Sequence, residues 1–491
     1  MAVTLLGNGP ELHDRLAGAA GDFSRIEPLL PTADEVLVAA RRTNVFHLAA
    51  ITQYAVERRG GRVEVPPLDP HPVSNLPQRF GQHLSLLQRA AAPYQVRVMI
   101  DDAVLPQLLA HVACRADPHN ETDLLRVLGV VCDTALVGPH WFVFEVINRC
   151  NAHCRFCNIH SPRRQPASDF LNAKLPFAVF ESTCRDLARM GTDGVTILAN
   201  GEPTLHPDFA RMITTARDCG LRVNFFTNGL LLDEAKAELV VRDEVDEMFC
   251  TVSAATPETY AELHGDAGAP EWRKLLANLR RLFEVRRLAG HGKPTAWMVN
   301  VICAPNAREI LAMADLAGEL GFDGFRPQLL RVDDYNRDLA LTPEDVAYLQ
   351  SVQGELESRL AAKGVELWDS YAPQLRHAGD NPDLWSGDEF IDHGCFVGYS
   401  LGLAKSNGDL SFCCTVKPVA NLADGSFRQH WAGGLYHRAR LSAKNLRVAG
   451  DLRLLDGKTL YTEACHHCDN HDINRRMHEM MDRYDMWRFL A

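Results

Sequence analysis

The sequence lacks any excess of positive charge. Its 491 residues include 51 lysines and arginines against 63 aspartates and glutamates, which gives a formal net charge of −12. Proteins that bind nucleic acid or an acidic membrane over a broad surface need a positive field, so we expect neither kind of partner. The sequence also lacks an apolar run long enough to cross a bilayer and a basic stretch typical of a signal peptide. We therefore expect a cytoplasmic protein.

Cysteine, in contrast, is abundant, with fourteen residues. Without a secretion signal, we expect a reducing compartment, where clustered cysteines bind metal more often than they form disulfides. Six cysteines are scattered singly, which is typical of small buried side chains. The others form two groups, a first one of Cys150, Cys154 and Cys157 and a second one of Cys395, Cys413, Cys414, Cys465 and Cys468.

The length of the chain predicts two to four domains, and no internal repeat or low-complexity tract divides it. We expect an N-terminal domain at residues 1–139, an α/β domain at 140–335, a polar helical bridge at 336–394 and a small C-terminal domain with the second cysteine group at 395–491. The helical bridge is expected to carry its acidic residues on solvated faces.

The N-terminal domain is predicted to be rich in helix. Residues 34–49 and 78–92 have helical patterns, and Thr32 and Glu35 lie at the spacing of a capping box before the first of them. No motif in this domain has a recognisable mechanism. It could bind a carrier, a peptide leader or a second subunit, and the sequence does not choose among them.

From residue 142, strand-like runs alternate with amphipathic helices, which is the pattern of parallel βα units. Helices that end near a glycine are expected at 177–190, 207–219 and 307–320. Six such units are too few for a closed eight-stranded barrel, so we predict an open, partial (β/α)6 barrel. The six expected strands are 142–147, 195–199, 223–227, 248–253, 297–303 and 325–330.

The first cysteine group has the spacing C-x3-C-x2-C directly after the first of these strands. Three thiolates this close suit an iron–sulfur cluster, and a cluster with only three protein ligands leaves one iron open to another molecule. With Phe156 before the last cysteine, the group resembles the defining motif of the radical S-adenosylmethionine (radical SAM) superfamily. The alternative is a zinc site, for which His153 or His160 could supply the fourth ligand.

A second motif follows the next strand, where the chain reads Asn200-Gly201-Glu202-Pro203. It resembles the Gly-Gly-Glu-Pro segment of the same superfamily, which grips the amino group of SAM, except that Asn200 replaces the first glycine. Glu202 offers a carboxylate to an ammonium group, and Pro203 fixes the turn. Alone, a Gly-Glu-Pro tripeptide is often no more than a turn. Its place one strand after the cysteines favours the SAM site.

Three further residues are candidates because of their positions near the ends of later strands. The resemblance, which covers roughly residues 140–335, implies that Asn228 contacts the methionine part or the ribose of SAM, Ser253 the ribose and Val301 the adenine. The alternatives are a turn-forming Asn-Gly pair, a helix cap and a core residue, respectively. Barrel enzymes place their chemistry at the carboxyl ends of the strands, where these positions fall.

The second cysteine group resembles the SPASM/Twitch extension of radical SAM enzymes. A full SPASM domain has further cysteines downstream, whereas none follows Cys468 here. The resemblance therefore implies one auxiliary [4Fe–4S] cluster, with Cys414 either spare or in place of its neighbour. Its four expected ligands are Cys395, Cys413, Cys465 and Cys468. The alternative is a zinc loop in which Cys465-His466-His467-Cys468 and His471 take part.

The resemblance implies a chemistry. SAM binds the open iron of a [4Fe–4S] cluster, an external donor of the flavodoxin or ferredoxin type reduces that cluster, and the C5′–S bond breaks. The resulting 5′-deoxyadenosyl radical takes a hydrogen atom from a substrate C–H bond. Because an auxiliary cluster could accept an electron, we expect a dehydrogenation-type modification of a carbohydrate or aminocyclitol natural-product intermediate. The alternatives are a radical epimerase, a peptide-modifying enzyme and, in a different class, a zinc-binding scaffold protein.

Candidate catalytic residues follow the last two strands. Arg331 could bind an anionic or hydroxylated substrate, and Asp333 or Asp334 could take a proton. Cys303, or Cys250, could return a hydrogen atom in an epimerase. The plainer alternatives are a solvated loop for the first three and a core position for the cysteines.

Overall fold

A computed structural model gives the structure of the protein. The described residues are 1–7, 13–14, 17, 21–264, 268–368, 371–380, 394–414, 418–446, 465, 468 and 471–490. They fall into two compact units, one of Met1–Val137 with Arg475–Ala491 and one of Gly138–Asn474. The last segment of the chain, which we expected beside the second cysteine group, thus belongs with the N-terminal unit. In the described residues, no helix is long and apolar enough to span a membrane.

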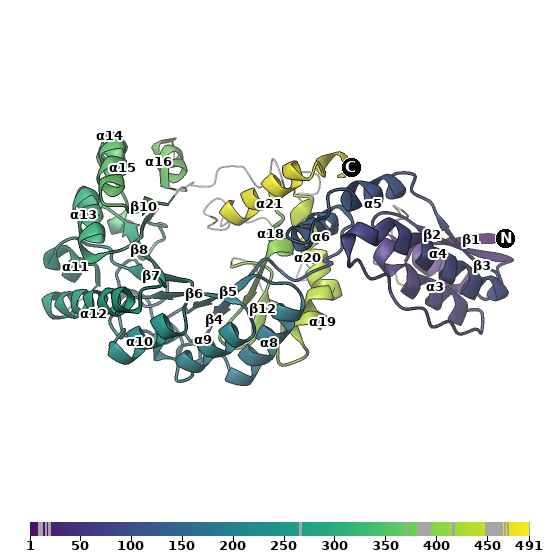
Figure 1. Ribbon diagram of the computed structural model, residues 1–491, viewed down its shortest axis with the longest axis horizontal. Coiled ribbons are helices and arrows are strands. Elements are labelled where there is room, and N and C mark those ends of the chain that lie inside the picture. Colours follow the sequence, from purple (N-terminus) through teal and green to yellow (C-terminus); the bar gives the residue numbers. More distant parts are fainter. Residues whose placement is uncertain are drawn as a thin grey trace. The chain divides into compact units, whose positions relative to one another are not determined.

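The N-terminal unit contains a parallel three-stranded sheet of β1 (Ala2–Leu5), β2 (Glu35–Ala40) and β3 (Val96–Ile100), in that spatial order. Helices make up most of the rest of this unit (Figure 1). They are α2 (Asp22–Ile26), η1 (Glu27–Leu29), η2 (Val45–His47), α3 (Leu48–Glu57), η3 (Val73–Asn75), α4 (Leu76–Ala91), η4 (Ala92–Tyr94), α5 (Leu105–Ala113) and α6 (Glu121–Val131), with η9 (Trp487–Phe489) from the end of the chain.

The prediction of a helix over 34–49 was wrong, whereas the helix expected at 78–92 is confirmed as α4. Residues 35–40 form the central strand of the small sheet, and Val36 and Val38 are fully buried. Two β-branched residues at alternate positions favour a strand when both neighbours are available to pair. Those neighbours, β1 and β3, lie far away in the sequence, so the helical pattern of the segment was misleading.

The second unit is built on a ten-stranded sheet with the spatial order β10-β9-β8-β7-β6-β5-β4-β11-β12-β13. Its six central strands are parallel, which confirms the expected partial barrel. They are β4 (Trp141–Glu145), β5 (Gly194–Leu198), β6 (Arg222–Thr227), β7 (Glu247–Thr251), β8 (Thr295–Ile302) and β9 (Gly324–Leu329). The flanking strands are β10 (Glu366–Leu367), β11 (Leu401–Ala404), β12 (Asp409–Ser411) and β13 (Pro418–Asn421).

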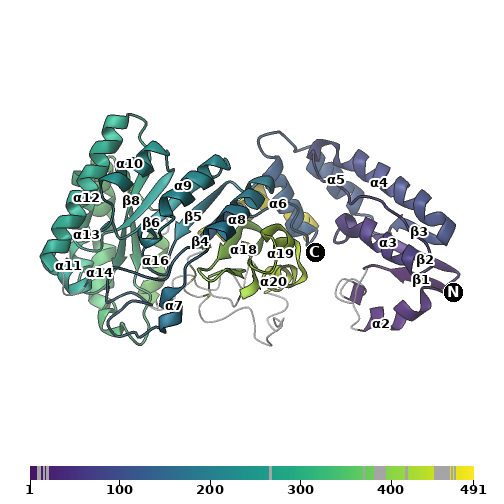
Figure 2. The ribbon, with the colours of Figure 1, turned by 90° about the horizontal axis from the view of Figure 1, so that it is seen from below.

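Helices α8 to α13 line one side of this sheet (Figures 1 and 2). Phe144 of β4 packs on Phe180 of α8 with ring centroids 4.5 Å apart. The barrel helices are α7 (Ser168–Asn172), α8 (Phe177–Arg189), η5 (Pro203–Leu205), α9 (Phe209–Asp218), α10 (Glu234–Arg242), α11 (Pro257–His264), α12 (Gly268–Ala289), η6 (Ala307–Glu309), α13 (Ile310–Leu320) and η7 (Arg337–Leu339). Strand side chains alternate between the two faces of the sheet. On the face opposite to these helices, Phe226 of β6 stacks on Phe249 of β7 with ring centroids 4.5 Å apart.

The segments after the barrel extend its sheet at both edges. Strand β10, from the expected bridge, pairs with β9, and β11, from the segment of the second cysteine group, pairs in parallel with β4. The two edge strands of the barrel, β4 and β9, therefore each gain a neighbouring strand. The segment that carries the second cysteine group is joined to the barrel by backbone hydrogen bonds. The helices of these segments are α14 (Pro343–Ser351), α15 (Gln353–Ala362), α16 (Tyr371–Asp380), α18 (Val397–Ser400), α19 (Phe427–Ala432) and α20 (Gly434–Lys444). Helix α21 (His471–Arg483) follows them, and its residues from Arg475 onward belong to the N-terminal unit.

Candidate functional site

The three cysteines of the first group lie on the loop that follows β4, and all three are half-buried. Burial, with smaller contributions from negative charge on Glu202 and Cys157, raises the pKa of the Cys150 thiol to about 11. Burial likewise raises the pKa of Cys154 well above its usual value, and charge on Cys157 and Cys150 adds to the effect. Positive charge, which iron ions supply, would favour the thiolate forms of Cys150 and Cys154.

Nitrogen donors surround the sulfurs of this loop. The backbone N–H groups of Ile159 and His160 donate to Cys157 Sγ at 3.4 and 3.2 Å. The ring nitrogen Nδ1 of His264, from the end of α11, lies 3.1 Å from Cys154 Sγ. Nitrogen atoms beside sulfur are typical of cysteines that hold an iron–sulfur cluster. The cysteines and their surroundings therefore fit an iron–sulfur cluster.

The zinc alternative for this loop gains little from the histidines. Nε2 of His160 lies 2.8 Å from the backbone oxygen of Asn148, which holds that ring nitrogen on the backbone. His153 is exposed. Among the residues that the structure describes, no three His, Cys, Asp or Glu side chains are gathered as they would be around a single metal ion.

The carboxylate of Glu202 is buried and already holds four hydrogen bonds. Its Oε1 accepts from the backbone and hydroxyl of Thr204 at 3.2 and 2.6 Å and from the hydroxyl of Thr227 at 2.8 Å. Its Oε2 accepts from the backbone N–H of Asn228 at 2.7 Å. Burial raises the pKa of Glu202, and these bonds oppose that rise. Glu202 therefore ties the turn after β5 to the end of β6, while a bond from an ammonium group to Oε2 stays a prediction.

Gly201 is the point of closest approach between this turn and the cysteine loop. A Cβ at this position would lie 1.8 Å from the backbone oxygen of Arg149, so no larger residue fits. The backbone N–H of Glu202 donates to the same oxygen at 2.8 Å. Asn200, which replaces the first glycine of the family motif, donates from Nδ2 to the carboxylate of Glu145 at 2.8 Å. Pro203 then opens the short helix η5.

Asn228 also contacts the cysteine loop. Its Nδ2 donates to Oδ1 of Asn151 at 2.9 Å and lies 4.0 Å from Cys150 Sγ. Its Oδ1 accepts from the backbone N–H of Leu230, as expected of a turn residue. The turn that we weighed as the alternative is present at this residue, and a contact of Asn228 with SAM stays a prediction.

Ser253 is fully buried at the end of β7. Its hydroxyl accepts a hydrogen bond from the backbone N–H of Val301 at 3.0 Å, and its backbone oxygen accepts one from Nδ2 of Asn306. The hydroxyl thus joins β7 to β8. This contact is neither of the two roles that the sequence predicted for Ser253, and a ribose contact stays a prediction.

Cys303 lies in a small apolar cluster that reaches the cysteine loop. Its buried members are Leu263, Cys303, Leu330 and Leu339, and Phe156, Val301 and Val332 pack against them. Burial raises the pKa of Cys303 to about 12, which keeps the thiol protonated. Cys250 lies outside this cluster. Its sulfur faces Gly229, close to Leu275 of α12.

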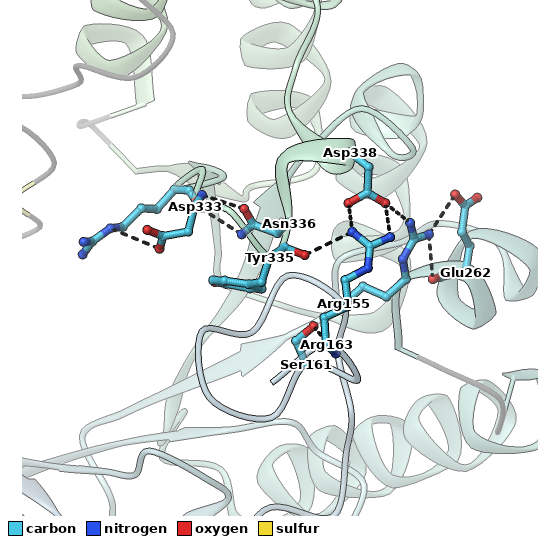
Figure 3. A network of polar contacts seen from close by, with 9 residues as sticks. Arg155, Ser161, Arg163, Glu262, Asp333, Tyr335, Asn336 and Asp338 are labelled. Carbon is cyan, nitrogen blue, oxygen red and sulfur yellow. Dashed lines mark hydrogen bonds and ion pairs between the residues drawn. The ribbon is translucent and has the colours of Figure 1, made fainter. Parts of the chain in front are cut away.

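A polar network that the sequence did not predict joins the loop after β9 to the cysteine loop (Figure 3). Arg155 NH2 donates to the carboxylate of Asp338 at 2.7 Å, and Arg163 NH2 donates to the same oxygen at 3.0 Å. Arg163 also donates to the backbone oxygen of Tyr335, whose hydroxyl donates to the backbone oxygen of Phe156 at 3.3 Å. Arg163 and then Arg155 lower the pKa of Asp338. The only signal in the sequence was an arginine between two cysteines of the first group.

The predicted catalytic residues of this loop lie at its solvent side. Arg331 and Asp333 pair loosely, with Nε and Oδ2 3.9 Å apart, and both are close to half exposed. Asp334 is fully exposed and pairs with Arg337 at 3.4 Å. The structure thus brings Arg331 and Asp333 together beside the polar network, whereas Asp334 has the surroundings of a solvated loop residue.

In the second cysteine group, burial raises the pKa of Cys395, and charge on Cys413, Cys465 and Cys414 adds to the effect. Cys413 is half-buried and Cys414 is exposed. Cys468 is half-buried as well, whereas His466 and His467 of the zinc alternative lie outside the described residues. These cysteines fit a second cluster, and the choice between Cys413 and Cys414 stays a prediction.

Comparison with known proteins agrees with this site. Residues 144–299, which run from β4 to β8, match the family model of the Radical SAM superfamily. An AdoMet-dependent heme synthase of Methanosarcina barkeri (strain Fusaro / DSM 804) is 25% identical over 343 residues, which cover 67% of this chain and 91% of that protein. A PqqA peptide cyclase of Gluconobacter oxydans (strain 621H) is 28% identical over 186 residues, 37% of this chain and about half (47%) of the cyclase.

Solved structures support the fold. SuiB of Streptococcus suis matches with a TM-score of 0.51 and 15% identity over 77% of this chain and 85% of its own. SuiB bound to S-adenosylmethionine matches with a TM-score of 0.50 and 15% identity over 81% and 88% of the two chains. At these identities the likeness concerns the fold alone. Residues 144–299, which form most of the parallel barrel, are thus similar to the Radical SAM superfamily.

Proposed function

We propose that this enzyme catalyses an oxidative, dehydrogenation-type modification that begins with reductive cleavage of SAM. Cys150, Cys154 and Cys157 would hold the [4Fe–4S] cluster, and the ends of β5 to β8 would hold SAM. A bound cluster and SAM supply a 5′-deoxyadenosyl radical that removes a hydrogen atom from a C–H bond. The observation that carries the proposal is the half-buried cysteine loop, to which Gly201 and Asn228 are closely packed or bonded.

The chain's own residues position and shield this site. Glu202 fixes the turn after β5 against the end of β6, and Gly201 allows that turn to approach the cysteine loop. The apolar cluster around Cys303 covers one side of Phe156 and so keeps water from that side of the loop. Preorganisation and exclusion of water are the contributions that a protein makes when its cofactors carry the difficult step.

The oxidative outcome is supported by the second cysteine group. Cys395, Cys413, Cys465 and Cys468 would hold an auxiliary [4Fe–4S] cluster, a group that supplies one-electron transfer. The electrostatic effect of Cys413 and Cys465 on the pKa of Cys395 supports this ligand set. An epimerase would instead use a thiol, and Cys303 is fully buried in its apolar cluster. That position favours oxidation over return of a hydrogen atom.

The substrate class is proposed from the oxidative outcome. A carbohydrate or aminocyclitol alcohol agrees with an oxidative outcome, because oxidation of an alcohol carbon gives a ketone or aldehyde. A peptide side chain is the second candidate, and the similarity to PqqA peptide cyclases favours it. A substrate panel therefore includes aminocyclitols, peptides and, in view of the heme synthase relative, a tetrapyrrole.

The experiment is anaerobic purification of the full chain with metal analysis. We expect brown protein with about eight irons, the sum of two four-iron clusters, and 5′-deoxyadenosine when SAM and a reductant are added. Replacement of the three cysteines of the first group by alanine should abolish that product. The matched control is Cys219→Ala, a half-buried single cysteine on the helix side of the barrel.

Two results would contradict the proposal. Colourless protein rich in zinc would favour the scaffold alternative, and unchanged 5′-deoxyadenosine formation in the triple variant would remove the cluster site. With a substrate from the panel, a product two hydrogens lighter supports oxidation. Solvent deuterium in a product that otherwise has the mass of the substrate would indicate epimerisation.

A further inference from the structure

His264 is held in a fixed position beside one sulfur of the first cysteine group. Its ring stacks on Tyr260 with centroids 4.2 Å apart and planes within 14°. It also meets Phe156 edge-on at 5.4 Å and 88°. The backbone N–H of Arg155 donates to the oxygen of Leu263, which fixes the end of α11 to the cysteine loop. These contacts determine the place of the imidazole on three sides.

The two ring nitrogens of His264 have different surroundings. Nδ1 lies 3.1 Å from Cys154 Sγ, whereas Nε2 is buried without a hydrogen-bond partner among the described residues. A cysteine that binds iron does so as a thiolate, which has lone pairs and no proton to donate. The hydrogen between the two atoms must then be on Nδ1, and the neutral tautomer leaves Nε2 bare.

We propose that His264 donates a hydrogen bond from Nδ1 to the sulfur of Cys154 and thereby raises the reduction potential of the [4Fe–4S] cluster. This inference rests on the proposed function, because it requires the cluster at Cys150, Cys154 and Cys157. A donor to a ligand sulfur withdraws negative charge, and the reduced cluster has one more electron than the oxidised cluster. The bond therefore stabilises the reduced form more than the oxidised one. His264 is a positioning residue that acts through Cys154.

The test is a redox titration followed by electron paramagnetic resonance on three reconstituted full-length proteins. They are the wild type, His264→Leu, which removes the donor, and His264→Asn, whose amide can donate from a similar position. The signal of the first cluster is recognised by its response to SAM. For the leucine variant we expect the ratio of reduced to oxidised cluster at a fixed potential to fall by on the order of tenfold. For a one-electron couple, this is a downward shift of about 59 mV.

The asparagine variant should titrate close to the wild type. The inference is overturned if the leucine variant titrates with the wild type, or if both variants shift equally while they hold full iron, since packing would then explain the change. If the variants lose iron, pulsed electron paramagnetic resonance on wild-type protein with ¹⁵N-labelled histidine tests the bond through the coupling of the histidine nitrogen to the cluster. One weakly coupled imidazole nitrogen supports the bond, and no coupling, or that of a nitrogen bound directly to iron, refutes it. Wild-type protein without iron at these cysteines refutes the proposed function instead.

Discussion

Replacement of Asp338 by asparagine tests whether the network at the mouth of the barrel holds the cysteine loop in place. The carboxylate of Asp338 accepts hydrogen bonds from Arg155 and Arg163, which both belong to that loop. The amide of asparagine has no charge and only one oxygen to accept from them. Asp338→Asn therefore weakens both ion pairs and leaves the backbone of the loop unchanged.

The size of the effect follows from exposure. The side chain of Asp338 is 38% exposed, that of Arg155 32% and that of Arg163 56%. Ion pairs exposed to this degree each contribute about 0.2–1 kcal/mol, so the loss of both costs about 1 kcal/mol. At 25 °C this free energy corresponds to about a fivefold change in the population of the open loop. The expected effect is local, since the rest of the unit does not depend on Asp338.

The pH range of the effect follows from the sign of the pKa shift. Arg163 and Arg155 lower the pKa of Asp338 in the folded protein. Its contribution is therefore complete above the unfolded value of about 3.9 and is lost as the pH falls through the lowered folded value. Measurement at pH 7 captures the whole contribution. High salt should reduce the difference between variant and wild type, because exposed charges are screened.

Hydrogen exchange of the peptide that covers residues 155–164 provides the assay. In Asp338→Asn we expect its protected amides to exchange about fivefold faster than in the wild type. The matched control is Asp334→Asn, in the same loop, where the carboxylate is fully exposed and pairs only loosely with Arg337. Equal exchange in Asp338→Asn and the wild type, or equal acceleration in both variants, would refute the reasoning.

Three further predictions concern the turn after β5 and the second cysteine group. In thermal melts, Gly201→Ala should lower the free energy of unfolding by about 1–3 kcal/mol, because its Cβ would overlap the backbone of the cysteine loop. The control Gly354→Ala, whose Cβ would meet no atom within 4 Å, should not destabilise the protein. Glu202→Gln should lower the free energy of unfolding by about 1–3 kcal/mol, since an amide cannot accept from all four donors. It should also weaken SAM binding in calorimetry, and unchanged stability and affinity would contradict this. Cys413→Ala should lower bound iron by about four per chain whereas Cys414→Ala should not, and the reverse result would exchange the roles of these two neighbouring cysteines.

Much of the second unit could be predicted from the sequence because its signals are local. Each of the six central strands is a short apolar run bounded by turn residues, and all six are confirmed as β4 to β9. Such runs need no knowledge of a distant partner, since a strand buried on both faces is apolar whichever strand lies beside it. The segment 35–40 shows the opposite case, because its place between β1 and β3 overrode a helical pattern.

What the sequence by itself determined is the resemblance: the spacing of Cys150, Cys154 and Cys157 pointed to the Radical SAM superfamily, whose model residues 144–299 match, because cysteines of one motif can be close in the chain. What the tertiary structure alone decided is how that chemistry is held. The carboxylate of Glu202 accepts a hydrogen bond from Thr227 of the next strand. Asp338 accepts one from Arg155, which lies 183 positions away in the sequence, and His264 contacts Cys154, which lies 110 positions away. Contacts between residues so far apart leave no local pattern, because they depend on which loops the parallel strands bring to the same edge of the sheet.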